Sequence, residues 1–590
     1  MASDTLSPAA VEDVSRTDPA RGAELARALV AAHPEDEAAA RLLDQVVREF
    51  AASLAVPRTA PLNLTPPVRE AVRLLSTGQD EAAEIALRMH LRNVPDDVPA
   101  IRLMAQIAMQ CGFPADALRI LRHALEVDPA SAEIWAALGQ ASYQKSLAED
   151  RPDQVDDAIA AFDKALTLDP TNEVSLSFKA AVEVQVRRLE QGEASLRSVL
   201  AAYPGSAYAW VNLGFLLKTV GRFGEAVAAY RTAFAIDRAC GPAWWGLANM
   251  KRARFFRFDL EHMEAALALP AISPVAATDI HFALSKALDD HRDYARAAEH
   301  LVEGNALRRE SLPHSAEAVT QSVDAAIDIF TPAFFEQRAG WGHRSPAPIF
   351  ILGMPRSGST LVEQILSSHS QVEATEELYI VAQLGAEMAR LHPDTPRTVE
   401  ALSAAEAAAL GERYIELAAT HRRTTRLHFT DKNPTNWRQV CLIATMLPNA
   451  RIIDVRRHPL DCGFANYVQH YRSGGSFSYG QSDIAEYYRN YVRLMRHIDA
   501  VLPGRVHRII YEDLVDDLEP EVRRLLDYLG LEFEPACLRF FETERAILTP
   551  SSEQVRQPIN RAGIGRWSNY EPWLDELKQG LGGLVSDWRD

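Results

Sequence analysis

The chain has 590 residues, too many for one hydrophobic core, and this length predicts about two to four domains. Hydrophobic residues make up 47% and charged residues 24%, as in ordinary soluble globular proteins. A net charge of −18 argues against a general nucleic-acid surface, because neutralising phosphates requires a basic face.

The cysteines and the first residues bear on where the protein resides. Five cysteines are scattered without metal-type spacing, which is typical of reduced thiols in a cytoplasmic protein. Residues Met1–Asp4 show no basic region ahead of an apolar stretch, and no window approaches the roughly 18 apolar residues of a membrane span. We therefore expect a soluble, cytoplasmic protein with no membrane span and no nucleic-acid partner.

Residues 1–65 are expected to form an N-terminal helical segment and a linker. The stretch from Pro19 to Phe50 is alanine-rich and amphipathic, which favours helices. The stretch from Val56 to Pro67 contains four prolines, which interrupt helical periodicity and predict the linker.

Beyond the linker the sequence repeats itself. Prolines at positions 95, 129, 170 and 204 end helical stretches and are separated by 34, 41 and 34 residues. Tryptophan, leucine and glycine recur at matching positions, as Trp135, Leu138 and Gly139 and again as Trp210, Leu213 and Gly214. The pattern resembles tetratricopeptide repeats, whose period is about 34 residues. The longer unit contains an insertion near Tyr143–Pro152, which we expect to extend a loop between two helices.

The resemblance to tetratricopeptide repeats covers about residues 70–310 and implies an α-solenoid, which we place at residues 66–340. In such a fold each helical pair buries its apolar face only against its neighbours. Small residues then allow close approach, and aromatic residues fill the core between repeats. A solenoid of this kind usually binds a protein or peptide partner or supports a homo-oligomer.

An apolar run at Ile349–Leu352 is followed by the turn Gly353–Thr360 and then by apolar residues at helical spacing. This pattern predicts a buried strand, a tight phosphate-binding loop and a helix whose N-terminus faces the anion. A nucleotide triphosphatase loop would carry a lysine where Ser359 stands, which disfavours ATP chemistry. The residues that the loop offers to a bound anion are Arg356, Ser357, Gly358, Ser359 and Thr360.

The segment Pro355–Val372, with Glu376 and Glu377 after it, resembles the phosphosulfate-binding loop of a known family. This family is the sulfotransferases that use 3′-phosphoadenosine 5′-phosphosulfate (PAPS), and the protein-tyrosine sulfotransferase branch is the most similar. The resemblance runs through ordered segments from about residue 348 to residue 570. It implies PAPS as co-substrate, no metal, and a P-loop-like parallel α/β domain with helices on both faces, at residues 346–590.

The resemblance implies catalytic roles for three residues. Glu377 matches the glutamate that takes the proton of the acceptor hydroxyl, a step that is needed because a protonated hydroxyl is a poor nucleophile. Lys432 lies in the stretch Thr430–Pro434, which is similar to a turn of the family and would place the lysine on the bridging oxygen between sulfate and phosphate. Ser551 matches the serine that steadies the sulfuryl group.

Other residues are implied to hold the nucleotide. Arg456 and Arg457, at the end of a second predicted strand over residues 450–455, are similar to the element that binds the 3′-phosphate, and Arg457 is the better match. Guanidinium groups suit phosphate because they bind it in a bidentate way. A third predicted strand over residues 506–510 leads to Tyr511, which matches a tyrosine beside the adenine.

Two departures from the family pattern leave nucleotide contacts open. Ala465 stands where the family carries a serine, with Asn466 beside it. Gln557 stands where the family carries a lysine, and Arg556, one residue earlier, is the candidate replacement.

The function predicted from the sequence is transfer of the sulfuryl group from PAPS to an acceptor hydroxyl. A protein tyrosine is one candidate acceptor, and a saccharide, a lipid or a small metabolite fits the motifs equally well. Two alternatives stay open at this stage. One is a P-loop kinase or nucleotide hydrolase, and the other is a non-catalytic repeat scaffold with a vestigial nucleotide domain, which Ala465 and Gln557 favour.

Overall fold

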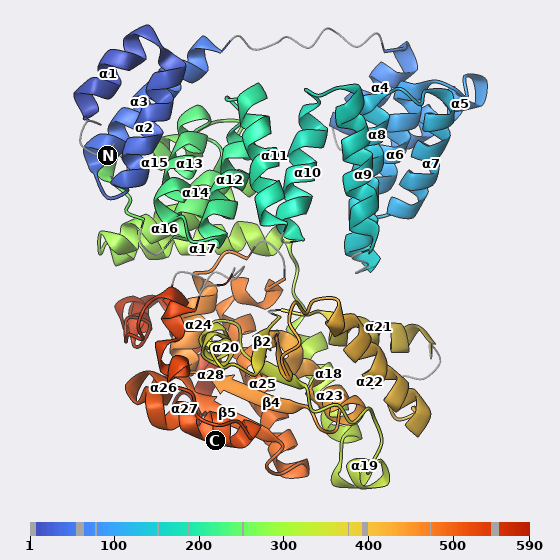
Figure 1. Cartoon of the computed structure of the whole chain (residues 1–590), viewed down its shortest axis with the longest axis vertical. Coiled ribbons are helices and arrows are strands. Elements are labelled where there is room, and N and C mark those ends of the chain that lie inside the picture. The colour runs from blue at the N-terminus through green and yellow to red at the C-terminus, as the bar shows by residue number, and fades with distance from the viewer. Residues whose placement is uncertain are drawn as a thin grey trace. The chain divides into compact units, whose positions relative to one another are not determined.

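The computed structural model describes residues 7–54, 64–76, 79–149, 153–186, 188–250, 253–375, 377–391, 399–471, 474–543, 545 and 554–589. The chain divides into two compact units (Figure 1). The first comprises residues 1–218 and 222–247, and the second comprises residues 219–221 and 248–590. No helix among the described residues is both long and apolar enough to cross a bilayer.

The first unit is helical throughout its described part. Consecutive helices pack in pairs, as expected for tetratricopeptide repeats. The helices are α1 (Pro8–Thr17), α2 (Pro19–Ala32), α3 (Glu37–Ser53), α4 (Pro66–Ser76), α5 (Asp80–Asn93), α6 (Val98–Gln110), α7 (Pro114–Val127), α8 (Ala132–Glu149), α9 (Asp153–Leu168), α10 (Glu173–Gln185), α11 (Leu189–Ala202), α12 (Ala207–Thr219) and α13 (Phe223–Ile236), with α14 (Gly241–Ala248) following.

The recurring glycines are explained by close approach within each pair. A Cβ atom on Gly139 would lie 2.6 Å from the ring of Phe162, and one on Gly214 would lie 2.9 Å from the ring of Tyr230. Real Cβ atoms do not approach other atoms so closely, so each glycine is needed for the aromatic ring of the second helix to pack against the first.

The insertion near Tyr143–Pro152 does not extend a loop, and this expectation was wrong as far as the described residues show. Helix α8 has 18 residues, whereas the corresponding helices α6, α10 and α12 have 13 each. Residues 141–149 contain no glycine or proline and continue the helix. Residues 150–152 lie outside the described part of the chain.

The first helices of the chain pack against the last repeat of the first unit. Helices α2 and α3 contact α13, at the opposite end of the row of helices from α4 and α5 (Figure 1). The guanidinium of Arg238 lies 2.6 Å from the carboxylate of the buried Asp44 on α3. This ion pair accounts for Arg238, which stands where other repeats carry a helix-ending proline.

The second unit contains a parallel sheet of five strands in the order β2-β3-β1-β4-β5 (Figure 1). Strand β1 is in the centre, with Ile351 opposite Lys432 of β3 and Gly353 opposite Val455 of β4. The strands are β1 (Pro348–Gly353), β2 (Val372–Ala374), β3 (His428–Lys432), β4 (Arg451–Arg456) and β5 (Val506–Ile510).

Helices cover both faces of this sheet. Ile349 and Ile351 of β1 pack with Val362 of α20 and Leu525 of α27 on one face. On the other face, the ring of Phe350 lies 5.3 Å from that of Tyr414 on α22. The α-helices of this part are α20 (Ser359–Ser367), α21 (Ile380–Leu391), α22 (Ala404–Ala419), α23 (Val440–Met446), α24 (Pro459–Tyr467), α25 (Gln481–Val501), α26 (Tyr511–Asp516), α27 (Leu518–Leu529) and α28 (Asp575–Leu581).

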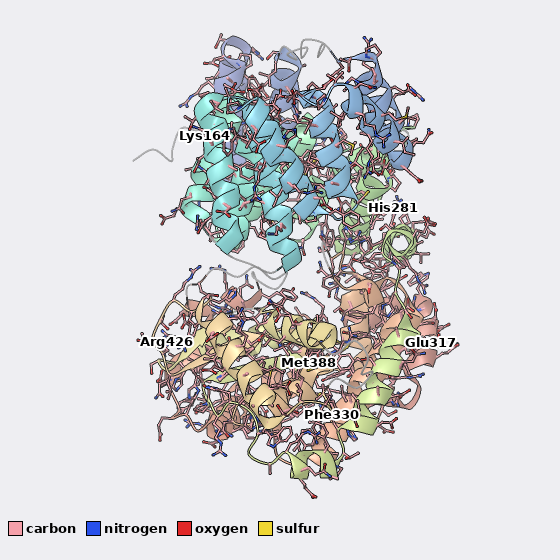
Figure 2. All side chains as sticks on the ribbon, turned by 90° about the vertical axis from the view of Figure 1, so that its right-hand side faces the viewer. Lys164, His281, Glu317, Phe330, Met388 and Arg426 are labelled. Atoms are coloured by element: carbon pink, nitrogen blue, oxygen red, sulfur yellow. The ribbon has the colours of Figure 1, made fainter. Side chains whose placement is uncertain are left out.

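The sequence predicted β1, β4 and β5 but not β2 and β3. The stretch Thr430–Lys432 was expected in a turn, and this was wrong, because these residues end strand β3 and the chain turns only after them. Arg426, labelled in Figure 2, lies just before β3 and donates a hydrogen bond to the carbonyl oxygen of Val372 at 2.7 Å. This bond helps to hold the short strand β2 beside β3.

Five further helices group with the sheet in the second unit, although the sequence places them with the repeats. Asp279 of α16 pairs with His470 at 3.0 Å, and Asn305 of α17 donates to the carbonyl oxygen of Tyr467 at 3.2 Å. Phe330, labelled in Figure 2, follows α18, which packs along α25. These helices are α15 (Arg257–Leu267), α16 (Pro274–Asp290), α17 (Tyr294–Ser311), α18 (Ala316–Ile329) and α19 (Pro332–Gln337).

Candidate active site

The loop after β1 has the backbone of an anion cradle. Gly353 has φ +141°, Arg356 has φ +67° and Gly358 has φ +106°, and α20 begins directly after this last glycine. The first N–H groups of a helix have no partner within the helix and point toward its N-terminal end. The loop therefore presents backbone N–H groups at the carboxyl edge of the sheet, where ligands of parallel α/β folds bind.

Tyr511, the first residue of α26 after β5, packs directly on this loop. A Cβ atom on Gly358 would lie 2.5 Å from Cδ2 of Tyr511, so the ring occupies the space that any other side chain at position 358 would need. Burial raises the pKa of the Tyr511 hydroxyl. The structure thus brings the predicted adenine-side tyrosine and the predicted phosphate loop into contact.

Arg457, which follows β4, joins the same place. Its Nη1 donates a hydrogen bond to the carbonyl oxygen of Arg356 at 2.9 Å, and its Nη2 donates to the carbonyl oxygen of Gly563. The guanidinium carbon lies 5.0 Å from the centre of the Tyr511 ring. The loop, Arg457 and Tyr511 therefore form one cluster at the ends of three neighbouring strands.

Arg456 points elsewhere. It is fully buried, lies 3.2 Å from the carboxylate of Asp454 and donates to the carbonyl oxygen of Trp588 at 3.0 Å. Burial works against its charge, but Tyr491 and Asp454 raise the pKa of Arg456 above its ordinary value. Successive residues at a strand end alternate in direction, which is why only one of the two arginines lies beside the loop.

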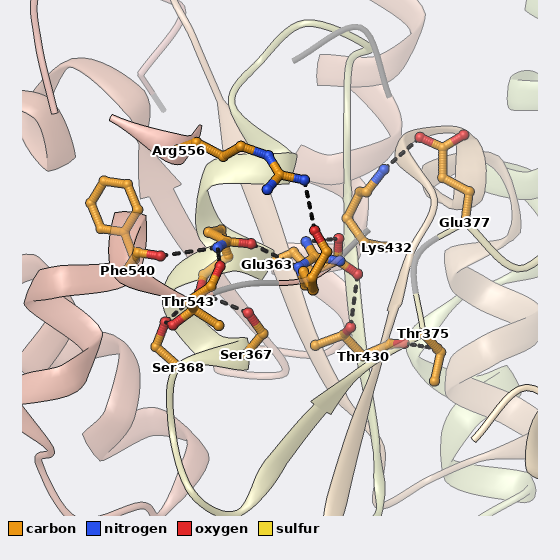
Figure 3. Close-up of polar contacts among 12 residues, drawn as sticks. Glu363, Ser367, Ser368, Thr375, Glu377, Thr430, Lys432, Phe540, Thr543 and Arg556 are labelled. Carbon is orange, nitrogen blue, oxygen red and sulfur yellow. Dashed lines mark hydrogen bonds and ion pairs between the residues drawn. The ribbon is translucent and has the colours of Figure 1, made fainter. Parts of the chain in front are cut away.

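Lys432 and Glu377 form an ion pair at the end of β3 (Figure 3). The buried Lys432 Nζ lies 2.5 Å from Glu377 Oε1, and the glutamate side chain is 34% exposed. Lys432 is opposite Ile351, two residues before the end of β1, so the pair lies close to the start of the loop. The two residues expected to act on the leaving oxygen and on the acceptor proton are thus adjacent.

Glu363 of α20 supports the strand that carries Lys432, and the sequence did not reveal this role. Its carboxylate accepts from Thr430 Oγ1 at 3.0 Å and lies 2.9 Å from Nη2 of Arg545 (Figure 3). Burial alone would raise the pKa of Glu363, but Arg545 and Lys432 hold it below its ordinary range. An acidic residue in the apolar stretch of a helix that packs on a sheet is the signal that could have predicted a buried pair.

Asn466 braces the loop from the side of α24. Its Nδ2 donates to the carbonyl oxygen of Pro355 at 2.8 Å, and its Oδ1 accepts from the hydroxyl of Tyr471 at 2.8 Å. Ala465, at the family's serine position, is the neighbouring residue. The polar side chain of α24 that contacts the loop is therefore the amide of Asn466, one residue after the position where the family carries a serine.

Comparisons with known proteins match separate parts of the chain to known families. A model described as "Sulfotransferase family" matches residues 348–535, and two tetratricopeptide-repeat models match residues 102–173 and 207–240. Residues 348–535 form a sulfotransferase-family domain. Tetratricopeptide repeats precede it in the chain.

Relatives of the sulfotransferase domain and its repeats are distant. An uncharacterized protein of Aquifex aeolicus is 31% identical over 329 residues, which are 53% of this chain and 43% of that protein. Protein-tyrosine sulfotransferase 2 of Gallus gallus is 23% identical over 243 residues, 38% of this chain and 64% of the relative. The chain thus spans about two fifths to two thirds of the length of these curated relatives.

Among solved structures, the sulfotransferase domain of the Synechococcus PCC 7002 olefin synthase is 21% identical. The match covers 38% of this chain and 89% of that one, with a TM-score of 0.30.

Arg556, another predicted residue of the sulfotransferase domain, makes its contacts away from the cluster described above. Arg556 donates to the carbonyl oxygen of Arg545 at 2.8 Å, next to the Glu363 network (Figure 3). Ser551 lies outside the described residues. Within the described part of the chain, no group of three or more His, Cys, Asp or Glu side chains is arranged to hold a metal ion.

Proposed function

We propose that the chain is an enzyme that moves the sulfuryl group from PAPS to an acceptor hydroxyl. The observation that carries this proposal is the ion pair of Lys432 and Glu377, 2.5 Å apart at the end of the strand beside the loop strand. A lysine there stabilises charge on the leaving oxygen, and a carboxylate beside it accepts the proton of the attacking hydroxyl.

The loop offers donors that fit an anionic co-substrate. Ser357 Oγ is buried and makes no hydrogen bond within the described structure, although a hydroxyl in such a place normally finds a partner. The start of α20 adds backbone N–H groups. Both observations support binding of the phosphosulfate by Arg356, Ser357, Gly358, Ser359 and Thr360.

The cluster beside the loop suits the nucleotide end of PAPS. Arg457 and Tyr511 are proposed to contact the 3′-phosphate and the adenine, because they lie together against the loop. Arg456 and Arg556 remain predicted contacts, and their guanidinium groups donate to the carbonyl oxygens of Trp588 and Arg545, away from the loop. Ser551 remains the predicted contact to the sulfuryl group.

The chain's own residues divide the chemistry between them. Glu377 takes the proton as the acceptor oxygen attacks sulfur, and Lys432 stabilises the negative charge that moves to the bridging oxygen. In the absence of substrate the two neutralise each other, so the buried ammonium is not left without a counter-ion. Binding of the anionic co-substrate supplies Lys432 with a second anion and frees Glu377 to act as a base.

A peptide tyrosine is the acceptor that we propose. Glutamate is a suitable base for a phenol, and the relatives from Gallus gallus and Drosophila melanogaster are named protein-tyrosine sulfotransferases. The tetratricopeptide repeats are proposed to bind the protein that carries this tyrosine, because such repeats commonly bind peptide segments.

The test combines binding and transfer. Purified full-length chain is titrated with 3′,5′-adenosine bisphosphate and with ATP, and labelled PAPS is then added with cell extract. We expect binding of the bisphosphate and label on a protein acceptor. Magnesium-dependent ATP turnover would instead indicate a kinase or hydrolase, and binding of neither nucleotide would indicate a vestigial domain.

A further inference from the structure

Tyr379 lies at the candidate site with its hydroxyl beside the proposed base. It is located between β2 and α21, and the residue is 58% exposed. Its hydroxyl lies 3.5 Å from Glu377 Oε2, while the other oxygen of the same carboxylate is 2.5 Å from Lys432 Nζ. One carboxylate therefore links an accessible phenol to the buried lysine.

We propose that Tyr379 is itself a sulfuryl acceptor, so that the chain sulfates its own residue 379. This inference rests on the proposed function, since it uses the same donor and the same base. It adds that the acceptor position beside Glu377 takes a phenol and that the first phenol available there belongs to the protein.

The chemistry of this step balances without a further reactant. Although Tyr379 is 58% exposed, desolvation of its hydroxyl and the charge of Glu377 raise the pKa of this group to about 12, so the phenol is protonated at neutral pH. As the bond from the phenol oxygen to sulfur forms, the proton passes to Glu377. The bond from sulfur to the bridging oxygen breaks, and that oxygen keeps the electron pair next to Lys432. The products are a tyrosine sulfate ester, 3′,5′-adenosine bisphosphate and one proton.

Other tyrosines around the sheet are held in different contacts. Tyr414 donates to Asp431 at 2.9 Å, Tyr488 donates to the carbonyl oxygen of Arg457 at 2.8 Å, and both are buried. Tyr511 packs against Gly358. Of these four tyrosines, Tyr379 alone combines exposure with a contact to Glu377.

The geometry also limits the extent of the reaction. A sulfate ester on Tyr379 places a permanent negative charge beside Glu377, and like charges at such a distance repel each other. The modified chain should therefore carry one sulfate near the site and transfer further groups more slowly than the unmodified chain.

The test incubates the full-length chain with labelled PAPS and no other acceptor, and then maps the label by mass spectrometry of peptides. We expect at most one label per chain, on Tyr379, with a rate constant that does not depend on protein concentration. Tyr379→Phe should lose this label. Tyr208→Phe, which changes an exposed tyrosine of α12, should keep it.

The outcomes separate this inference from the proposed function. Label on proteins of a cell extract but none on the chain would overturn self-sulfation and leave the enzyme assignment intact. Label at a different residue, or a rate that rises with protein concentration, would also overturn it. If neither the chain nor the extract is labelled and the bisphosphate does not bind, both proposals fall together.

Discussion

Arg457 donates a hydrogen bond to the backbone carbonyl of Arg356 at 2.9 Å, although the two residues are 101 positions apart in the sequence. Arg356 has φ +67°, a backbone conformation that residues other than glycine rarely adopt. Backbone strain of this kind persists only where surrounding contacts hold it, and it is common at ligand sites. Arg457 thus helps to fix the loop after β1, and we propose that it also contacts the 3′-phosphate.

Replacing Arg457 tests both its contact with the loop and its proposed contact with the 3′-phosphate. Arg457→Lys keeps the charge but loses the planar fork that reaches two carbonyl oxygens. A hydrogen bond to a charged group contributes about 1.5–3 kcal/mol, so affinity for 3′,5′-adenosine bisphosphate should fall by roughly tenfold or more. Isothermal titration calorimetry measures this affinity. Arg523→Lys on the exposed side of α27 is the control, and equal affinities for the two variants would contradict the assignment.

Lys432 and Glu377 should be needed for transfer rather than for binding. Glu377→Ala removes the proposed base, and Lys432→Ala removes the cation proposed to act at the leaving oxygen, so each variant should lose about 10²-fold or more in transfer rate. The rate is measured with labelled PAPS, and retention of the nucleotide is checked by titration with the bisphosphate.

A matched control accompanies the two variants. Glu416→Ala removes a glutamate from the exposed side of α22 and should leave the rate unchanged. Full activity of Glu377→Ala would exclude this residue as the base. Loss of bisphosphate binding in both variants would show that the pair holds the nucleotide instead.

Asp431 should make the stability of the sheet depend on pH. Asp431 directly precedes Lys432 and is buried, and this burial raises the pKa of its carboxyl to about 8. The unfolded value is about 4, so between about pH 4 and 8 the folded chain holds a proton that the unfolded chain has released. The stability that this group contributes is full below about pH 4 and is lost as the pH rises toward 8.

The variant Asp431→Asn removes this titration while keeping the size of the side chain. Its stability should fall less steeply over the same pH range, by up to about 1.4 kcal/mol per pH unit relative to the natural chain. Urea unfolding followed by hydrogen exchange of the β1 and β3 amides reports on this part of the molecule. Equal pH slopes would show that the carboxyl is ionised in the fold.

The sequence predicted the strands that contain an uninterrupted apolar run, even where charged residues flank it. Strands β1 and β4 contain the apolar runs Ile349–Leu352 and Ile452–Ile453, and such runs indicate buried parallel strands. Strand β3 ends in Thr430, Asp431 and Lys432, which look like surface residues. They are buried because Glu363, Tyr414 and Glu377 satisfy them, and partners so distant in sequence cannot be seen in a local pattern.

The sequence predicted the residues expected to contact the ligand, but it did not predict the residues that hold them in place. The order of loop, lysine, arginine and tyrosine along the chain indicated a family, and parallel strands bring such segments to one edge of the sheet. The roles of Asn466 and Arg545 depend on contacts with Pro355 and Glu363, which are 111 and 182 positions away in the sequence. The docking of α2 and α3 on α13 likewise depends on Asp44 and Arg238, which are 194 positions apart.

Gly358 should be essential for two separable reasons, its positive φ and the ring of Tyr511. Gly358→Ala meets both obstacles, because the added Cβ would lie 2.5 Å from the ring. Gly504 has φ +75° with no atom within 4 Å of a built Cβ, so Gly504→Ala meets the strain alone. Strain of this kind costs about 1–3 kcal/mol. We expect both variants to unfold at a lower urea concentration, and only Gly358→Ala to lose bisphosphate binding. The double variant Gly358→Ala with Tyr511→Ala should recover part of the lost stability, because the Tyr511 ring that would clash with the added Cβ is absent. If it is no more stable than Gly358→Ala, the contact between the loop and Tyr511 does not limit position 358.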